Sequence, residues 1–240
     1  MDICLLMQKN DTNIPRKDFF LRGDLSYVAK GKTLYSENRT TEKCDIPVIS
    51  ADNADNGCAA AIINETKKRL SHGVFLDCEN NKTTDFEKLC EHLTNHKLQV
   101  FTPLSKDHIP GTIPVVSSSV TGGSLHEHFE ETHNRFRNFA VSIERMSMEF
   151  SLPCTSSKIR MLTKRGLLSK ISRYEPDIFF SPQMQCKYFL YNPSGDEVFA
   201  VLFDDNETIS GKLRLAKKHG AVCSFLVFSE ICDIFNDIIF

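Results

Sequence analysis

Short apolar runs alternate with amphipathic helical patterns along most of this chain, and no other feature constrains the fold as strongly. The apolar run over 73–79 is followed by a helical pattern over 83–96, and that pattern is followed by a second apolar run over 98–105. The runs are apolar almost throughout, as strands that are buried on both faces must be. Strand and helix patterns in this order predict βαβ units and a parallel sheet.

The same pattern extends towards both ends of the chain. Strands are predicted at 2–8, 46–53, 73–79, 98–105, 112–119, the first part of 139–150, 186–192, 197–205 and 221–230. Helices are predicted at 57–70, 83–96, 123–138, 158–172 and 206–220. The last helix places Gly220 at its C′ position. The runs at 186–192 and 197–205 are typical of a hairpin around Pro193-Ser194-Gly195.

The length helps to choose between a closed and an open form of this sheet. No G-x-G-x-x-G follows a strand and no P-loop is present, which disfavours the nucleotide-binding open sheets. A chain of 240 residues suits one barrel, for which about 250 residues are typical. We therefore predict one α/β domain over 1–240, a TIM-like (β/α) barrel of mostly parallel strands. Apart from the two runs of the hairpin, about seven strand candidates are visible, so the barrel is expected to be small or incomplete.

Residues 9–45 do not fit the alternation. They are polar and hard to interpret, and we treat them as an N-terminal excursion from the barrel. Within them, "FFLRGDLSYVAKGKTLYSE" is typical of a hairpin that turns at Gly31-Lys32.

Composition excludes several classes of function. The formal net charge is −2, so no basic field favours nucleic acid or an anionic membrane surface. No apolar run reaches the length of a transmembrane helix, and the short, acidic start lacks the features of a signal peptide. We therefore expect a cytoplasmic protein. Its nine cysteines are scattered without a C-x-x-C pair, which supports neither a zinc site nor any other metal or cofactor.

The segment "GVFLDCEN" (73–80) places two acids at the end of a buried strand. Positions two apart in a strand face the same way, so Asp77 and Glu79 share a face while Val74, Leu76 and Cys78 take the other. In a parallel barrel, the carboxyl ends of the strands carry the chemistry. Partial enclosure and a neighbouring carboxyl both raise a pKa, which suits a general acid. A structural role, in a helix cap or an ion pair, is the alternative.

Two stretches resemble family 18 of the glycoside hydrolases, the chitinase-like barrels, in a shortened bacterial form. "SHGVFLDCEN" is similar to the D-x-x-D-x-D-x-E motif of the family's fourth strand, and "EVFAVLFDDNETISGKLRLAKKHGAVCSFLVFSE" is similar to a late strand–helix–strand segment. The resemblance implies that Glu79 is the catalytic acid and that Asp77 orients the substrate's acetamido group. It also implies that the substrate's own N-acetyl oxygen serves as the nucleophile.

The chain departs from the family pattern at several positions. The two earlier acids of the motif fall on His72 and Phe75. The family's M-x-Y-D could match "MSME" (146–149), with Met148 in place of the tyrosine that contacts the acetamido group. The sequence also contains no tryptophan, although a tryptophan normally forms the floor for the sugar.

Three further acids are candidates for substrate binding. Glu144 ends a strand pattern in the same way as Asp77 and Glu79 do. A structural ion pair with Arg145 or another basic residue is the alternative. Asp52 follows the run "PVIS", where a turn or cap is the alternative. Asp204 lies at the end of the 197–205 run, where Asp205 or Asn206 is expected to cap the next helix. "VTGGSLHEHFEE" contains two histidines, but without the i, i+4 spacing of a helical metal pair.

These residues support three hypotheses. The first is a divergent glycosidase-like protein that acts on or binds N-acetylhexosamine glycans of the peptidoglycan or chitin type, with Glu79 and Asp77 as the acid groups. The second is a non-catalytic barrel that binds a glycan or a protein. The third is a metal-dependent phosphodiesterase with ligands at Asp77 and Glu79.

Overall fold

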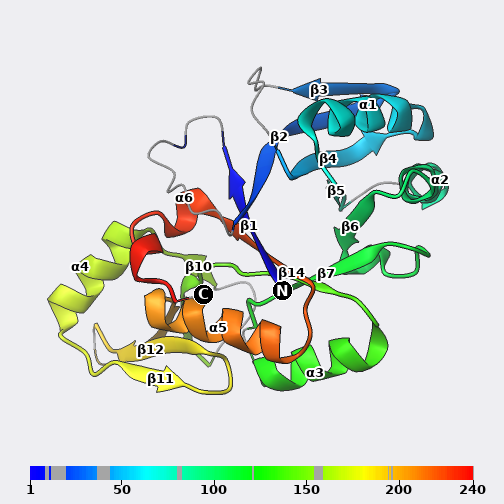
Figure 1. The fold of residues 1–240 in the computed structure, drawn as a ribbon. Coiled ribbons are helices and arrows are strands. Elements are labelled where there is room, and N and C mark those ends of the chain that lie inside the picture. The colour runs from blue at the N-terminus through cyan, green and yellow to red at the C-terminus, as the bar shows by residue number, and fades with distance from the viewer. Residues whose placement is uncertain are drawn as a thin grey trace.

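A closed ring of eight parallel strands forms the centre of the protein (Figure 1). The computed structural model describes residues 1–8, 11, 20–36, 44–79, 83–120, 122–153, 159–193, 195 and 197–239. The ring runs in the order β1, β2, β4, β5, β6, β7, β8, β14, and parallel pairing of β1 with β2 closes it. The strands are β1 (Asp2–Met7), β2 (Leu21–Gly31), β4 (Ile46–Ala54), β5 (Gly73–Asp77), β6 (Gln99–Pro103), β7 (Ile113–Ser117), β8 (Ala140–Ser142) and β14 (Cys223–Val227).

The predicted barrel is therefore confirmed, and it is complete rather than open. The strand that completes the ring is β2, which the sequence predicted only as part of a hairpin within the segment that we treated as an excursion. Its pairing with β4 shifts register between Asp24 and Tyr27 and again between Val28 and Lys30. Such irregularities break the periodic pattern from which a strand is recognised. The hairpin at Gly31-Lys32 is confirmed, because β2 pairs antiparallel with β3 (Thr33–Ser36) outside the ring.

Helices cover the outside of the ring. They are α1 (Ala59–Arg69), α2 (Thr83–Asn95), α3 (Leu125–Arg135) and α5 (Asn206–Lys218), with short 3-10 turns η1 (Asn56–Cys58) and η2 (Leu104–Lys106) between strands and helices. Figure 1 shows α1 and α2 on one side of the barrel and α3 and α5 together on another. In the described part of the chain, none of the helices has the length and apolar character needed to cross a membrane.

Two kinds of apolar core result from this arrangement. Val74, Leu76 and Cys78 on β5 pack outward against α1 and α2, as the alternation in the sequence predicted. Phe75 points the other way, into a core inside the ring that also contains Phe225 of β14. The inner face of β5 therefore leads from Phe75 up to Asp77 at the rim.

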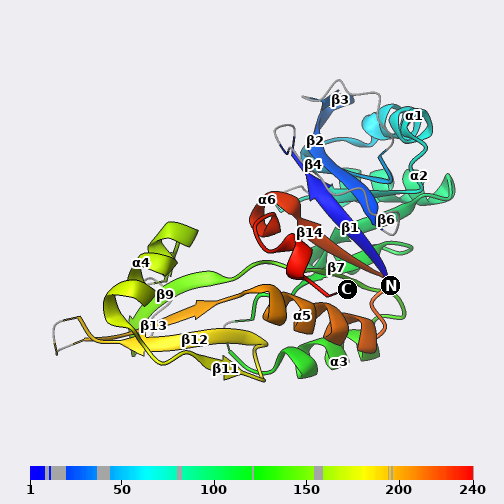
Figure 2. The same cartoon turned by 60° about the vertical axis from the view of Figure 1, so that its left-hand side comes forward.

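A second, smaller sheet interrupts the barrel between β8 and β14. It is antiparallel, with the order β10-β9-β13-β12-β11, and one helix, α4 (Lys164–Tyr174), packs on one of its faces. The strands are β9 (Ser147–Leu152), β10 (Arg160–Met161), β11 (Phe179–Ser181), β12 (Cys186–Tyr191) and β13 (Val198–Phe203). Figure 2 shows this insertion extending to one side of the barrel. The sequence predicted the β12–β13 hairpin but not its place outside the ring, and Ser194 of the predicted turn lies outside the described residues.

The chain returns to the barrel through α5 and a short C-terminal segment. Asp205 is the N-cap of α5 and forms a capping box with Thr208, which confirms the cap predicted at this place. Gly220 has a φ of +82°, as predicted for a C′ glycine. After β14 come α6 (Phe228–Ile231) and the 3-10 turn η4 (Phe235–Asp237).

Candidate active site

The carboxyl end of β5 carries the two acids that the sequence singled out. β5 is the fourth barrel strand in chain order, after β1, β2 and β4, because β3 lies outside the ring. Asp77 is its last residue, and Glu79 follows two positions later. Both side chains are exposed to solvent at the mouth of the barrel. The strand end therefore presents two carboxyl groups at the place where parallel barrels carry their functional groups.

Asp52 on the neighbouring strand β4 joins this group. The backbone N–H of Glu79 donates a hydrogen bond to Asp52 Oδ1 over 2.8 Å. The parallel pairing of β4 with β5 aligns Ser50 with Asp77, so Asp52 is level with Glu79. Asp52 thus contacts the backbone of a candidate catalytic residue. Asp55, a few residues later, accepts a hydrogen bond from the Gly57 N–H and caps η1.

The surroundings of Asp77 favour its protonated form. Partial burial at the rim is the largest influence and raises the pKa of the Asp77 carboxyl above its ordinary value. The negative charges of Glu79 and Asp52 act in the same direction. As the pH falls, Asp77 therefore takes up a proton earlier than an ordinary aspartate does. The rim therefore places the Asp77 carboxyl among groups that oppose its negative charge.

The region beneath Asp77 is apolar. Phe75, at the position of an acid in the family motif, packs against Phe225 with the ring centroids 5.1 Å apart and the rings tilted by 37°. Phe101 meets the same ring edge-on at 5.1 Å. These rings belong to an apolar core inside the barrel, so the polar side chains of this strand end lie at the rim.

A second group of acids lies at the ends of the later barrel strands. Glu144, just beyond β8, accepts a hydrogen bond from Ser117 Oγ at 3.0 Å, and its N–H donates to Ser118 Oγ. Glu144 is therefore held by the end of β7 rather than by Arg145.

Glu230, just beyond β14, lies near Glu144. Partial burial raises the pKa of the Glu230 carboxyl, the charge of Glu144 adds to this effect, and Arg145 opposes it. Neither Ser117 nor Glu230 was predicted from the sequence, although both stand at the ends of apolar runs.

Arg145 joins the barrel to the insertion. Its guanidinium donates to the carbonyl of Glu230 at 2.9 Å and to Asp233 Oδ1 at 2.5 Å. Lys164 at the start of α4 binds the other oxygen of Asp233 at 2.7 Å. These contacts tie α4 to the segment that follows β14. The insertion is thereby fixed beside the mouth of the barrel.

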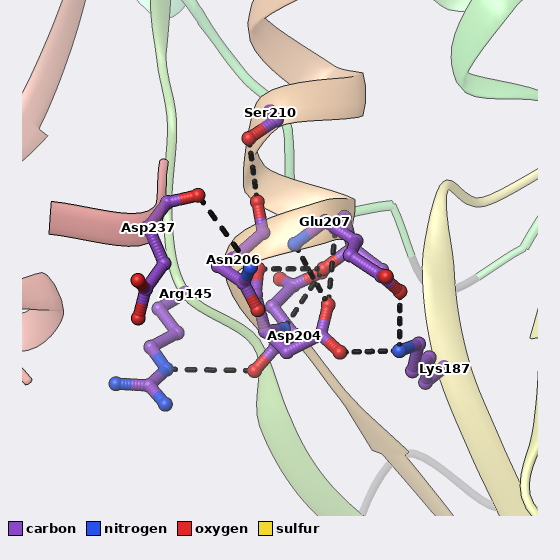
Figure 3. Close-up of polar contacts among 9 residues, drawn as sticks. Arg145, Lys187, Asp204, Asn206, Glu207, Ser210 and Asp237 are labelled. Carbon is purple, nitrogen blue, oxygen red and sulfur yellow. Dashed lines mark hydrogen bonds and ion pairs between the residues drawn. The ribbon is translucent and has the colours of Figure 1, made fainter. Parts of the chain in front are cut away.

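Asp204 differs from the other candidate acids because its side chain is enclosed. Its Oδ2 accepts from Lys212 Nζ at 2.6 Å and from the Met146 N–H at 2.7 Å, and both members of the ion pair have no exposed side-chain surface. Figure 3 shows the neighbouring contacts, in which the Asp204 carbonyl faces Arg145 and Lys187 reaches Glu207 at the start of α5. The carboxylate is therefore committed to a structural ion pair and is not presented to a ligand at the mouth.

Met148 is also placed away from the barrel mouth. It lies in β9 of the insertion sheet and packs among Cys186 and Leu202 in a separate apolar cluster. The segment 146–149 therefore does not form a barrel strand. Its resemblance to the family's M-x-Y-D does not carry over to the geometry, because a buried insertion strand cannot present a side chain to the rim.

The described residues offer no metal centre and no activated thiol. Within the described ranges, no group of three His, Cys, Asp or Glu side chains is arranged to hold a metal ion. The eight cysteines described are free thiols, and all except Cys232 are buried. Burial raises the pKa of Cys90 to about 12 and that of Cys58 to about 11. Thiols of this kind are poor nucleophiles near neutral pH. Cys154 lies outside the described residues.

Comparison with known proteins supports the fold. No family model matches the chain, and no curated protein matches its sequence. The spore cortex-lytic enzyme SleL of Bacillus cereus has a similar structure, with 14% identity and a TM-score of 0.67 over 95% of this chain and 71% of that one. A mutant family GH18 chitinase from Cycas revoluta, in complex with (GlcNAc)4, gives 11% identity and a TM-score of 0.68 over 97% and 96%.

A third similar structure is a chitinase from Chromobacterium violaceum, with 10% identity and a TM-score of 0.62 over 94% of this chain and 93% of that one. At these identities, the likeness concerns the fold alone. The chain therefore has the same (β/α) barrel fold as these solved structures, in agreement with the barrel that the sequence predicted.

Proposed function

We propose that this protein is a glycosidase-like enzyme that cleaves glycans containing N-acetylhexosamine at the mouth of its barrel. One observation carries the proposal: Asp77 and Glu79 stand together at the carboxyl end of the fourth strand of a closed barrel. The position of these two acids corresponds to the end of the motif that the sequence resembles. Chitinases and a spore cortex-lytic enzyme with the same fold support the choice of glycan as the ligand class.

In the proposed reaction, Glu79 donates its proton to the glycosidic oxygen as the bond to the anomeric carbon breaks. The acetamido oxygen of the same sugar attacks the anomeric carbon, so a second protein carboxylate is not needed as nucleophile. Asp77 accepts a hydrogen bond from the acetamido N–H and stabilises the positive charge that develops there. Water then opens the cyclic intermediate, and the Glu79 carboxylate takes a proton from that water, which restores the starting state.

The test is hydrolysis of fluorogenic N-acetylglucosamine oligomers and of peptidoglycan fragments. Glu79→Gln keeps the shape of the side chain and removes the acid, so turnover should fall by about 100-fold or more. Glu91→Gln is the matched control, because Glu91 is an exposed residue of α2 on the outside of the barrel. It should leave turnover unchanged. Absence of turnover by the unaltered protein on both substrates would refute the catalytic proposal.

A non-catalytic barrel that binds glycans is the second candidate, and Phe75 is the observation that favours it. An acid at that position would stand below Asp77 on the same face of β5, but the phenyl ring there packs against Phe225 instead. If binding without cleavage is the function, oligosaccharides should bind to the unaltered protein and to Glu79→Gln with similar affinity, without release of product.

A further inference from the structure

The proposed reaction gives no role to Asp52, although Asp52 contacts the candidate acid directly. β4 and β5 pair in parallel as far as Ser50 and Asp77, and the register ends there. One step further along the inner face stand Asp52 and Glu79. The Glu79 N–H donates to Asp52 Oδ1 at 2.8 Å in place of the next hydrogen bond between the strands. The Asp52 side chain therefore extends the contact between the two strands by one residue pair.

The interior of the barrel explains why an acid at this level is useful. The motif that the sequence resembles has an acid at position 75, two residues below Asp77. Here Phe75 occupies that position and packs in the apolar core with Val48 and Phe225. A carboxylate placed among these side chains would lose its hydration without an ionic partner, at a large cost in free energy. The rim, where Asp52 is only half-buried, accommodates a carboxylate more easily.

We infer that Asp52 is a positioning residue that supplies, from the neighbouring strand, the carboxylate missing at position 75. This inference rests on the proposed function of Glu79 and Asp77. Asp52 acts in two ways. Its hydrogen bond fixes the backbone of Glu79, which lies beyond the last paired residue of β5. Its negative charge, together with that of Glu79, faces Asp77 and disfavours the ionised form of that carboxyl.

Two substitutions separate these effects. Asp52→Asn keeps a side-chain oxygen that can accept from the Glu79 N–H but removes the charge, whereas Asp52→Ala removes both. We would titrate the Asp77 carboxyl by ¹³C NMR and follow hydrogen exchange of the Glu79 amide in the full chain. Both variants should lower the pKa of Asp77. Asp52→Ala alone should also accelerate exchange of the Glu79 amide, by about 5- to 10-fold for one lost hydrogen bond.

Kinetics then distinguish a positioning role from direct substrate binding. With Asp52→Asn, the acidic limb of the pH profile of kcat should move to lower pH while KM stays constant, because the Asp77 carboxylate that the proposed reaction uses then stays ionised further into acid. A raised KM with unchanged kcat and unchanged titration of Asp77 would mean that Asp52 binds substrate, and would overturn the inference. So would unchanged titration and unchanged exchange in both variants. Glu91→Gln again serves as control.

The NMR measurements do not depend on turnover. If the unaltered protein cleaves no glycan, the proposed function fails, but the titration of Asp77 and the exchange of the Glu79 amide still decide whether Asp52 organises the rim. If the protein is active and neither NMR property responds to Asp52, the positioning role fails and the proposed function stands.

Discussion

Replacing Lys212 by methionine should destabilise the protein without touching the mouth of the barrel. The Lys212 side chain has no exposed surface, and its ammonium group contacts Asp204 Oδ2 at 2.6 Å. Methionine fills nearly the same volume but leaves the Asp204 carboxylate buried without its counter-ion. In the described part of the chain, Asp204 Oδ1 already has no hydrogen-bond partner, and the Met146 N–H alone would remain on Oδ2.

Removal of one partner from a buried ion pair typically costs about 3–5 kcal/mol. The remaining N–H donor from Met146 places the expected loss at the lower end, about 3 kcal/mol. For a chain of this size, that loss corresponds to a fall in Tm of about 6–12 °C. Chemical unfolding in urea at pH 7 and a thermal scan would measure both quantities.

Two controls make the result specific. Lys217→Met changes an exposed residue of the same helix and should alter the free energy of unfolding by no more than about 0.5 kcal/mol. The double variant Asp204→Asn with Lys212→Met should be more stable than Lys212→Met alone, because no buried charge is left unpaired. If Lys212→Met costs under about 1 kcal/mol, the reasoning from burial and pairing is wrong. If Lys212→Met changed KM but not the free energy of unfolding, Asp204 would instead be a substrate-binding residue.

Three further predictions concern pH. Asp77→Asn should stabilise the fold at neutral pH, and the gain should vanish as the pH falls to about 3.8, because burial raises the pKa of Asp77; urea unfolding at several pH values checks this. Glu149→Gln should destabilise the insertion at pH 7, and less so below about 4.5. Burial raises the pKa of Glu149, but hydrogen bonds from Lys170 and other donors outweigh burial and lower it, so the ionised form stabilises the fold; an unchanged Tm would refute this. Acidification below about 6.5 should destabilise the unaltered protein more than the His219→Gln variant, because burial and His126 lower the pKa of His219 in the folded state. Measurement of Tm against pH for both proteins tests this prediction.

Much of the barrel was predictable because its strands are buried on both faces. The runs that became β5 and β6 are apolar throughout and are bounded by clear helical patterns, so the local signal and the tertiary environment agree. β2 was predicted only as a hairpin strand and not as a member of the ring, because its polar sequence lacks the continuous apolar run of the other barrel strands and its pairing with β4 is irregular. The insertion escaped recognition because β9 follows β8 after a few residues, and the sequence pattern assigned only the first part of 139–150 to a strand.

The candidate site was predictable only where one strand determines it. The expectation that Asp77 and Glu79 share a face comes from the two-residue period of a strand and needs no knowledge of neighbours, although β5 itself ends at Asp77. The contact between Asp52 and Glu79 depends on the register of β4 against β5, which is a property of the closed ring. The prediction that Asp204 binds substrate was wrong because the sequence around an acid before a helix does not show whether its side chain faces solvent or pairs with a buried lysine of that helix, here Lys212.

The order of strands also bears on which reaction the mouth can support. In the ring, β4 and β5 stand opposite β8 and β14, so Glu79 and Glu144 rise from opposite sides. Eight strands about 4.8 Å apart and tilted by about 36° enclose a ring about 15 Å across. Paired carboxylates that cleave glycosidic bonds by themselves lie about 5–10 Å apart. The Glu144 side chain would have to turn towards the barrel axis to pair with Glu79. Hydrogen bonds to Ser117 and Ser118 instead hold Glu144 beside the end of β7. This arrangement favours a reaction in which the acids of one side act with the substrate's own acetamido group.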